Sequence, residues 1–265
     1  MGNKIKHPAG AFCWAELSTS DAEAAKKFYS TLLGWKHHDD PIPGGGVYTM
    51  LRVDGGDVGA LFGSTDEMKA AGAPPCWMDY VTVTDAAATA AKAKRLGGTV
   101  IKDAFDVMDA GSMAMIQDPT GAMFAVWQPK QHHGYDYDDR RVGTACWHEL
   151  ATTDVERAGK FYSELFPWKR TILDLGPIPY TIFKIGETQA AGMLEMSGEL
   201  WGDAPPHWMT YFAVADCDAT AAKATTLGGM VCVPPTDIPT IGRFSVITDP
   251  QGAVFSIIAL AAKGK

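Results

Sequence analysis

One long segment occurs twice in this chain. Trp14–Lys36 and Trp147–Lys169, WAELSTSDAEAAKKFYSTLLGWK and WHELATTDVERAGKFYSELFPWK, are identical at 14 of 23 aligned positions. Matching phrases continue downstream, with PPCWM at 74–78 answered by PPHWM at 205–209 and DPTG at 118–121 answered by DPQG at 249–252. A repeat of about 125 residues is a duplicated domain and not a solenoid unit. Every candidate site can therefore be compared between two copies.

Composition and charge limit the classes of partner. The 265 residues are 46% hydrophobic and 20% charged, which is typical of globular domains, and the length favours two of them. The net charge is −8 without a basic cluster, which argues against nucleic acid and membrane surfaces. No apolar run approaches the roughly 20 residues that a membrane span needs. Five cysteines without a CxxC motif favour a reduced, cytoplasmic protein, which we expect as a monomer or homodimer.

Each copy predicts two β-α-β-β-β modules. The first module begins with a strand over Ala11–Thr19 and a helix over Ala22–Leu33, for which Asp21 is a suitable N-cap. The other predicted elements of the first copy are strands at 35–40, 47–53, 57–62, 77–84, 99–105, 112–117 and 122–128 and a helix at 86–96. The second copy repeats this order.

These patterns place domain 1 at 8–129, a linker at 130–143 and domain 2 at 144–262. The linker is polar and lacks periodicity, which is typical of a solvated connector. The linker residues that could bind a metal are His132, His133, Asp136, Asp138 and Asp139, but the composition favours the connector.

The order strand, FYxxL helix, three strands and closing DPxG strand resembles the vicinal oxygen chelate superfamily, which includes glyoxalase I, bleomycin-resistance proteins and extradiol dioxygenases. More narrowly, the chain is similar to tandem two-domain actinobacterial members, among them a mycobacterial culture-filtrate antigen and proteins labelled hydroxylases. The shared phrases are PIPGGGVYTM, DAGSMAMIQDPTGA and IPTIGRFSVITDPQGAVFS. The resemblance implies an α+β fold in which the paired modules of each domain form an eight-stranded open barrel around a cavity.

The same resemblance implies where metal ligands would lie, on the first and fourth strand of each module. The aligned positions are Trp14, Leu61, Met78 and Ala125 in domain 1 and Trp147, Leu194, Met209 and Ser256 in domain 2. None is His, Glu or Gln, whereas a divalent metal needs several N, O or S donors at once. We therefore predict no cofactor, with a divalent metal as the alternative.

Strand alternation assigns residues to the cavity face. Trp14 and Glu16 share one face of the first strand, as Trp147 and Glu149 do in the second copy. Either carboxylate could be structural, bonded to a backbone amide or an arginine, or it could act as a general base in an apolar surround. Each tryptophan could fill the core or stack on a planar ligand. The second modules add Met78 and Tyr80 in domain 1 and Met209 and Tyr211 in domain 2.

Domain 2 carries further polar side chains. Glu149, Glu195 and His207 could form a displaced metal site, although a lone histidine at a strand start is usually only hydrogen-bonded. Arg243 could bind an anionic ligand group in the pocket, or it could be a surface arginine paired with carboxylates.

Three functions fit these observations. The first is metal-independent binding of a small apolar or aromatic molecule, for sequestration or conversion. The second is an enzyme, which could be a lyase, an isomerase or a hydroxylase or dioxygenase-like protein. It would act through Glu16 and Glu149 or through a displaced metal in domain 2. The third is a structural, antigen-like role suggested by the culture-filtrate relative. No flavin or dinucleotide motif supports a hydroxylase.

Overall fold

The computed structural model describes residues 5–42, 45–137, 140–173, 179–198 and 201–261. Contacts divide the chain into two compact units. The first unit comprises Met1–Trp14, Met78–Gly134 and Trp147–Met209, and the second comprises Ala15–Trp77, Tyr135–Cys146 and Thr210–Lys265. Each unit therefore draws residues from both sequence repeats. Within the described residues no helix is long and apolar enough to span a membrane.

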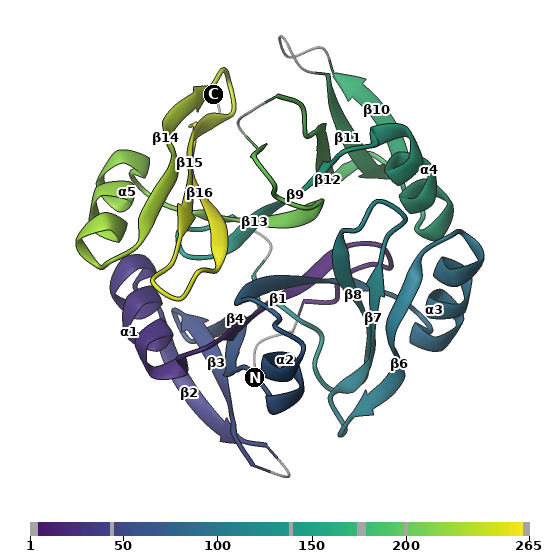
Figure 1. The fold of residues 1–265 in the computed structure, drawn as a ribbon, viewed down its shortest axis with the longest axis horizontal. Helices are drawn as coiled ribbons and strands as arrows, with labels where there is room; N and C mark the ends of the chain where they lie inside the picture. The colour runs from purple at the N-terminus through teal and green to yellow at the C-terminus, as the bar shows by residue number, and fades with distance from the viewer. Residues whose placement is uncertain (1–4, 43–44, 138–139, 174–178, 199–200, 262–265) are drawn as a thin grey trace. The chain divides into compact units, whose positions relative to one another are not determined.

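The α+β prediction is confirmed, because the chain forms two eight-stranded mixed sheets with few helices (Figure 1). The first copy contains β1 (Phe12–Thr19), α1 (Ala22–Leu33), β2 (Lys36–Pro41), β3 (Val47–Val53), β4 (Gly56–Gly63), α2 (Asp66–Ala70), β5 (Cys76–Thr82), α3 (Ala86–Arg95), β6 (Thr99–Val107), β7 (Gly111–Gln117) and β8 (Met123–Pro129). The second copy contains β9 (Ala145–Thr152), α4 (Val155–Leu165), β10 (Lys169–Leu173), β11 (Tyr180–Ile185), β12 (Thr188–Glu195), β13 (His207–Ala213), α5 (Cys217–Thr226), β14 (Met230–Ile238), β15 (Gly242–Thr248) and β16 (Val254–Leu260).

The strand order is the same in both sheets. It is β2-β3-β4-β1-β5-β8-β7-β6 in the first and β10-β11-β12-β9-β13-β16-β15-β14 in the second, and neither sheet closes on itself. The domain limits at 129 and 144 stay a prediction. The short helix α2, which Thr65 caps, was not predicted from the sequence.

The four long helices begin at aspartates. Asp21, Asp85, Asp154 and Asp216 each accept a hydrogen bond from the amide three residues later, at 2.8–3.0 Å. The ends of the two equivalent helices differ: α1 stops at Gly34 with φ +74°, whereas α4 stops at an extended Phe166 before Pro167.

A chain of three buried polar groups ties the second unit together. The Tyr29 hydroxyl on α1 donates to Asp249 Oδ2 at 2.9 Å and accepts from Trp77 Nε1 at 3.0 Å. Burial, reinforced by the charge of Asp249, raises the pKa of Tyr29, so the phenol stays protonated. The other Asp249 oxygen accepts three backbone amides of its own DPQG turn, those of residues 251–253. A helix of the first copy is thereby bonded to a turn of the second.

The first unit repeats this arrangement with the copies exchanged. Trp208 Nε1 donates to the Tyr162 hydroxyl at 2.8 Å, and burial beside the charge of Asp118 in the DPTG turn raises the pKa of Tyr162. Asp118 Oδ1 accepts the amides of Thr120, Gly121 and Ala122. The paired helices are in contact within each unit, α3 with α4 in the first and α1 with α5 in the second (Figure 1).

The linker is less solvated than its composition predicts. Tyr135 is buried, Asp136 accepts the backbone amide of Asp57 at 2.9 Å, and the Tyr137 hydroxyl donates to the Val53 carbonyl at 2.9 Å. The linker therefore packs on the β3–β4 turn, because its aromatic side chains find apolar and backbone partners there. Residues 138–139 lie outside the described residues.

We expect Tyr29→Phe and Tyr162→Phe each to lower the free energy of unfolding by about 1–3 kcal/mol, because each leaves a buried carboxylate and a buried indole N–H without the hydroxyl. Urea denaturation followed by circular dichroism would measure the change. The exposed Lys27→Ala on α1 is the control and should change stability by less than about 0.5 kcal/mol. Wild-type stability of both tyrosine variants would contradict this role.

Candidate functional site

In domain 2, three side chains form a hydrogen-bonded cluster on one face of the sheet. The Tyr180 hydroxyl on β11 donates to Glu149 Oε2 on β9 at 2.5 Å, and Trp147 Nε1 donates to the Tyr180 hydroxyl at 2.9 Å. Burial raises the pKa of Tyr180 far above its usual range, so the phenol remains a donor to the carboxylate. All three residues are half-buried. We refer to Trp147, Tyr180 and Glu149 as the domain 2 cluster.

The same tyrosine–glutamate bond recurs in domain 1. Within the second unit, the Tyr48 hydroxyl donates to Glu16 Oε2 at 2.7 Å, and the Tyr48 ring stacks on Phe62 with centroids 6.4 Å apart. Tyr48 is the second residue of β3 and Tyr180 is the first residue of β11, so the two tyrosines occupy corresponding positions in their modules. Two copies that diverge elsewhere have both kept a phenol on the carboxylate.

The other aromatic residues of domain 1 lie in the first unit. Trp14 is only 4% exposed, and the His132 ring packs edge-on against it with centroids 4.6 Å apart. Trp127 Nε1 donates to the His132 carbonyl at 2.9 Å and so fixes this part of the linker. The predicted pocket residue Tyr80 lies near Trp127, and its hydroxyl approaches Met113 Sδ at 3.8 Å. Trp14 is therefore buried with His132 against it, whereas Trp147 is half-buried.

The remaining predicted wall residues differ in burial. Met78 is half-buried and Met209 is buried. In the second unit, Tyr211 pairs with Ser256 across β13 and β16 and lies near Phe244, with ring centroids 6.2 Å apart. The Ser256 hydroxyl is buried, and it has no hydrogen-bond partner among the described residues.

The structure does not support Arg243 as a pocket residue. Its guanidinium makes two hydrogen bonds to Asp218 at 2.7 and 3.1 Å and one to Asp237 at 2.9 Å. Arg243 alternates with Phe244, which lies near Tyr211, and therefore sits on the opposite face, where α5 supplies Asp218. Arg243 is therefore a surface arginine that is paired with two carboxylates.

The residues at the superfamily's ligand positions do not fit a metal. Strand pairing sets Phe62, not Leu61, on the face of Glu16, because Ser18 pairs with Phe62 and Leu17 with Leu61. Of the resulting eight positions, only Ser256 carries a side-chain oxygen. Among the described residues no three His, Cys, Asp or Glu side chains are placed to hold a metal ion.

The three residues of the predicted displaced metal site in domain 2 do not form such a cluster. Glu195 pairs with Thr152 on β9, which places it on the opposite face of the sheet from Glu149. The His207 ring bonds through Nδ1 to the carbonyl of Pro205 at 2.8 Å. The structure therefore does not bring Glu149, Glu195 and His207 together. His148 is not part of the cluster either, since it is buried beside Asp79, with Nδ1 and Oδ1 3.0 Å apart, and stacks on Phe12.

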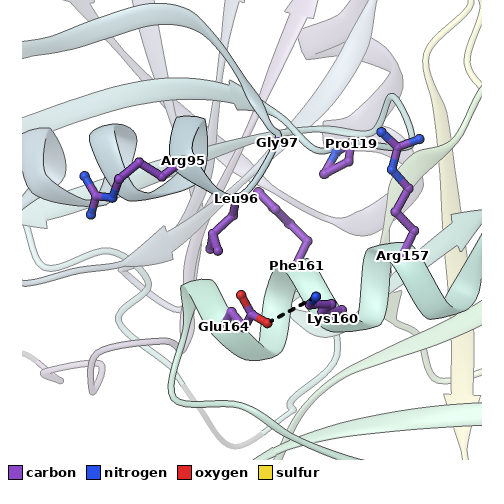
Figure 2. Close-up of a pocket in the computed structure, with 8 residues that line it drawn as sticks. All are labelled: Arg95, Leu96, Gly97, Pro119, Arg157, Lys160, Phe161 and Glu164. Atoms are coloured by element: carbon purple, nitrogen blue, oxygen red, sulfur yellow. Dashed lines mark ion pairs between the residues drawn. The ribbon is translucent and has the colours of Figure 1, made fainter.

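A separate cleft of about 350 Å³ lies in the first unit between the end of α3 and the outer face of α4 (Figure 2). Phe161 and Leu96 line it, and Arg95 and Arg157 flank it. Figure 2 shows these two arginine side chains extending to opposite sides of the cleft, while Lys160 lies beside Glu164 at 3.9 Å. Because the cations do not converge, this cleft lacks the geometry of an anion site.

The predicted site residues did not include Tyr48 or Tyr180, and His132 was considered only as a possible metal ligand in the linker. The tyrosines recur in the two copies at the start of the third strand, and this repetition was the available signal. His132 had no such signal, because only the fold of the linker brings it against Trp14.

Comparison with known proteins accounts for this architecture. Residues 14–127 match the family model of the glyoxalase-like domain, and residues 144–257 match that of the glyoxalase/bleomycin resistance protein/dioxygenase superfamily. The chain belongs to this superfamily. The expected tandem arrangement is therefore confirmed.

Superfamily relatives match along almost the whole chain. "Putative glyoxylase CFP32" of Mycobacterium tuberculosis is 40% identical over 262 residues, which are 97% of this chain and 98% of the relative. "Anthracycline biosynthesis protein DnrV" of Streptomyces peucetius is 34% identical over 263 residues, with 95% and 94% coverage.

Among solved structures of the superfamily, the Mn(II)-bound glyoxalase from Novosphingobium aromaticivorans aligns with a TM-score of 0.65 at 14% identity and covers 95% of this chain and 82% of its own. The 2,3-dioxygenase LapB from Pseudomonas sp. KL28 aligns with a TM-score of 0.62 at 14% identity and coverages of 97% and 95%. At this identity the likeness concerns the fold.

We expect the purified protein to carry less than about 0.2 equivalents of Zn, Mn, Fe or Ni after dialysis, because the eight ligand positions lack donors. Inductively coupled plasma mass spectrometry would measure the content. Stoichiometric metal would contradict the prediction. If Glu195→Ala or His207→Ala then lost that metal, the alternative of a displaced metal site in domain 2 would be supported.

Proposed function

We propose that this superfamily member binds a planar, largely apolar small molecule, and that recognition requires no metal at the superfamily's ligand positions. The observation that carries the proposal is the phenol-bound carboxylate present in both copies, Tyr48 on Glu16 and Tyr180 on Glu149. One oriented polar group beside aromatic side chains is typical of a small-molecule site. The ring would stack on tryptophan and the polar group of the ligand would meet the carboxylate.

The burial of the two tryptophans favours domain 2 as the principal site. Trp147 is half-buried, whereas Trp14 is 4% exposed and packed against His132. Trp147 therefore offers more accessible surface to a ligand than Trp14, which His132 contacts. The relatives named for anthracycline biosynthesis support a fused-ring ligand.

A second candidate function is conversion of the bound molecule, with Glu149 as a general base. The Tyr180 hydroxyl orients this carboxylate, and an oriented carboxylate beside an apolar wall can take a proton from a bound ligand. Proton abstraction of this kind suits a lyase or isomerase and uses only residues of this chain. We further propose that the protein acts in the cytoplasm as a monomer or homodimer.

We expect fused-ring phenols such as 2-naphthol and 1,8-dihydroxyanthraquinone to bind and to quench tryptophan fluorescence. Trp147→Ala should weaken binding by about 1–3 kcal/mol, because the stacking wall is lost. Trp14→Ala is the matched control and should change affinity by less than about 0.5 kcal/mol. Isothermal titration calorimetry would measure both. Wild-type affinity in Trp147→Ala for a probe that binds would remove the domain 2 cluster from the site.

Glu149→Gln separates binding from catalysis. If the carboxylate only accepts a ligand hydrogen bond, affinity should fall by about 1.5–3 kcal/mol. If it acts as a base, turnover of a substrate should fall by a factor of roughly 10² or more, while affinity persists. Glu16→Gln is the matched variant in domain 1 and should affect neither quantity to the same extent.

A further inference from the structure

Aromatic side chains from three adjacent strands of the first sheet lie close together in the first unit. They are Trp14 on β1, Tyr80 on β5 and Trp127 on β8, and we call them the aromatic corner. The ring centroids of Tyr80 and Trp127 are 6.4 Å apart. The His132 ring packs edge-on against both indoles, with its centroid 4.6 Å from that of Trp14 and 6.0 Å from that of Trp127. Edge-to-face packing is a preferred arrangement of aromatic rings, and here one of the rings comes from the linker.

The segment that carries His132 is bound to the sheet by its backbone as well. We call residues 130–134 the strap. The amides of Lys130 and His132 both donate to the carbonyl of Ala110 in the β6–β7 turn, each at 3.0 Å. The His132 carbonyl accepts a hydrogen bond from Trp127 Nε1 at 2.9 Å. A solvated connector would leave these groups to water, so the strap is held against the corner by specific bonds.

Two glycines make room for this arrangement. Gly134 is buried with φ +102°, and a Cβ atom built on it would collide with the carbonyl of Cys13. A Cβ atom built on Gly111 would lie 2.5 Å from Cζ2 of Trp127. A side chain at either position would therefore move the strap or the indole that holds it. In the second copy Ile258 stands at the register position of Trp127, and its side chain has no N–H to hold a strap.

We propose that the strap is a built-in occupant of the aromatic corner, so that the His132 ring holds the place that an aromatic ring of a ligand would otherwise take. Domain 1 then keeps an aromatic wall but closes it to ligands, whereas Trp147 in domain 2 stays half-buried. The molecule that fits the opened corner is a flat ring of the size of imidazole, packed edge-on against two indoles. This inference goes beyond the proposed function, whose principal site is in domain 2.

Removing the His132 ring tests the proposal. His132→Ala keeps the backbone bonds of the strap and leaves a space lined by aromatic rings, and such a space can bind a small aromatic molecule. We expect 4-methylimidazole, which replaces the missing side chain, to bind this variant at least about tenfold more tightly than it binds the wild type. Isothermal titration calorimetry would measure both affinities. A folded His132→Ala without this gain would overturn the proposal.

Two further variants locate the gain. His133→Ala is the matched control, because His133 is the half-buried neighbour of His132 in the strap, and it should gain no affinity for 4-methylimidazole. Trp14→Ala combined with His132→Ala should abolish the gain, because one wall of the corner is lost. A gain that appears in His133→Ala, or that persists without Trp14, would place the binding elsewhere and overturn the proposal.

Gly134→Ala tests whether the strap itself closes the corner. The added methyl group does not fit against the Cys13 carbonyl, so the His132 ring should move off Trp14 and affinity for 4-methylimidazole should rise several-fold. Melting curves followed by circular dichroism report whether the variant folds. If it does not, Trp127→Phe takes its place, because it removes the N–H that holds the His132 carbonyl but keeps a ring. Wild-type affinity in the folded variant would contradict the closing role of the strap.

The closed corner and the proposed function can fail separately. If no planar probe binds the wild type but His132→Ala gains 4-methylimidazole, the proposed function fails and the closed corner stands. If 2-naphthol binds the wild type through Trp147 and His132→Ala gains nothing, the proposed function stands and the closed corner is wrong. Weaker binding of 2-naphthol to Trp14→Ala than to the wild type would show that the corner is already open, and would also overturn the closure.

Discussion

Each unit depends on one buried chain of hydrogen bonds from an indole through a phenol to a turn aspartate. In the second unit it runs from Trp77 through Tyr29 to Asp249, and in the first Trp208 donates to Tyr162, which lies beside Asp118. A buried carboxylate is costly unless its oxygens are satisfied, and in Asp249 one oxygen accepts the amides of its own turn while the other accepts from the phenol. The turn that leads into the last strand of a copy is thereby fixed on a helix of the other copy, and the aromatic core assembles around that junction.

The domain 2 cluster repeats this chemistry in a less buried place. A tryptophan N–H again donates to a tyrosine hydroxyl, which again donates to a carboxylate, but Trp147, Tyr180 and Glu149 are half-buried. The buried version stabilises the fold, whereas we propose the half-buried version as a binding site. Burial, and not residue type, therefore distinguishes the two sets of hydrogen bonds.

Much of the fold followed from the sequence because its signals are local or repeated. The N-capping aspartates, the alternating strands and the doubled DPxG turns gave the module order, and the repeat gave the tandem architecture. Residues that depend on side-chain partners were harder to assign. The sequence left Arg243 open between a pocket and a surface position, because its partners Asp218 and Asp237 lie on other elements. The fourth-strand ligand position of domain 1 was predicted at Leu61 but lies at Phe62, because strand register cannot be read from a hydrophobic run. The contact of His132 with Trp14 could not be predicted, because His132 lies in a polar linker without periodicity.

The exchange of helix and turn between copies has an evolutionary consequence. A gene encoding a single copy would specify a tyrosine on its first helix and an aspartate in its last turn, each lacking the partner that the other copy supplies. Two such chains could satisfy each other, so the present arrangement is what fusion of a self-complementary pair would leave. Once fused, the halves are free to diverge only where they do not meet, and recombination that replaces one half must preserve both ends of each bond.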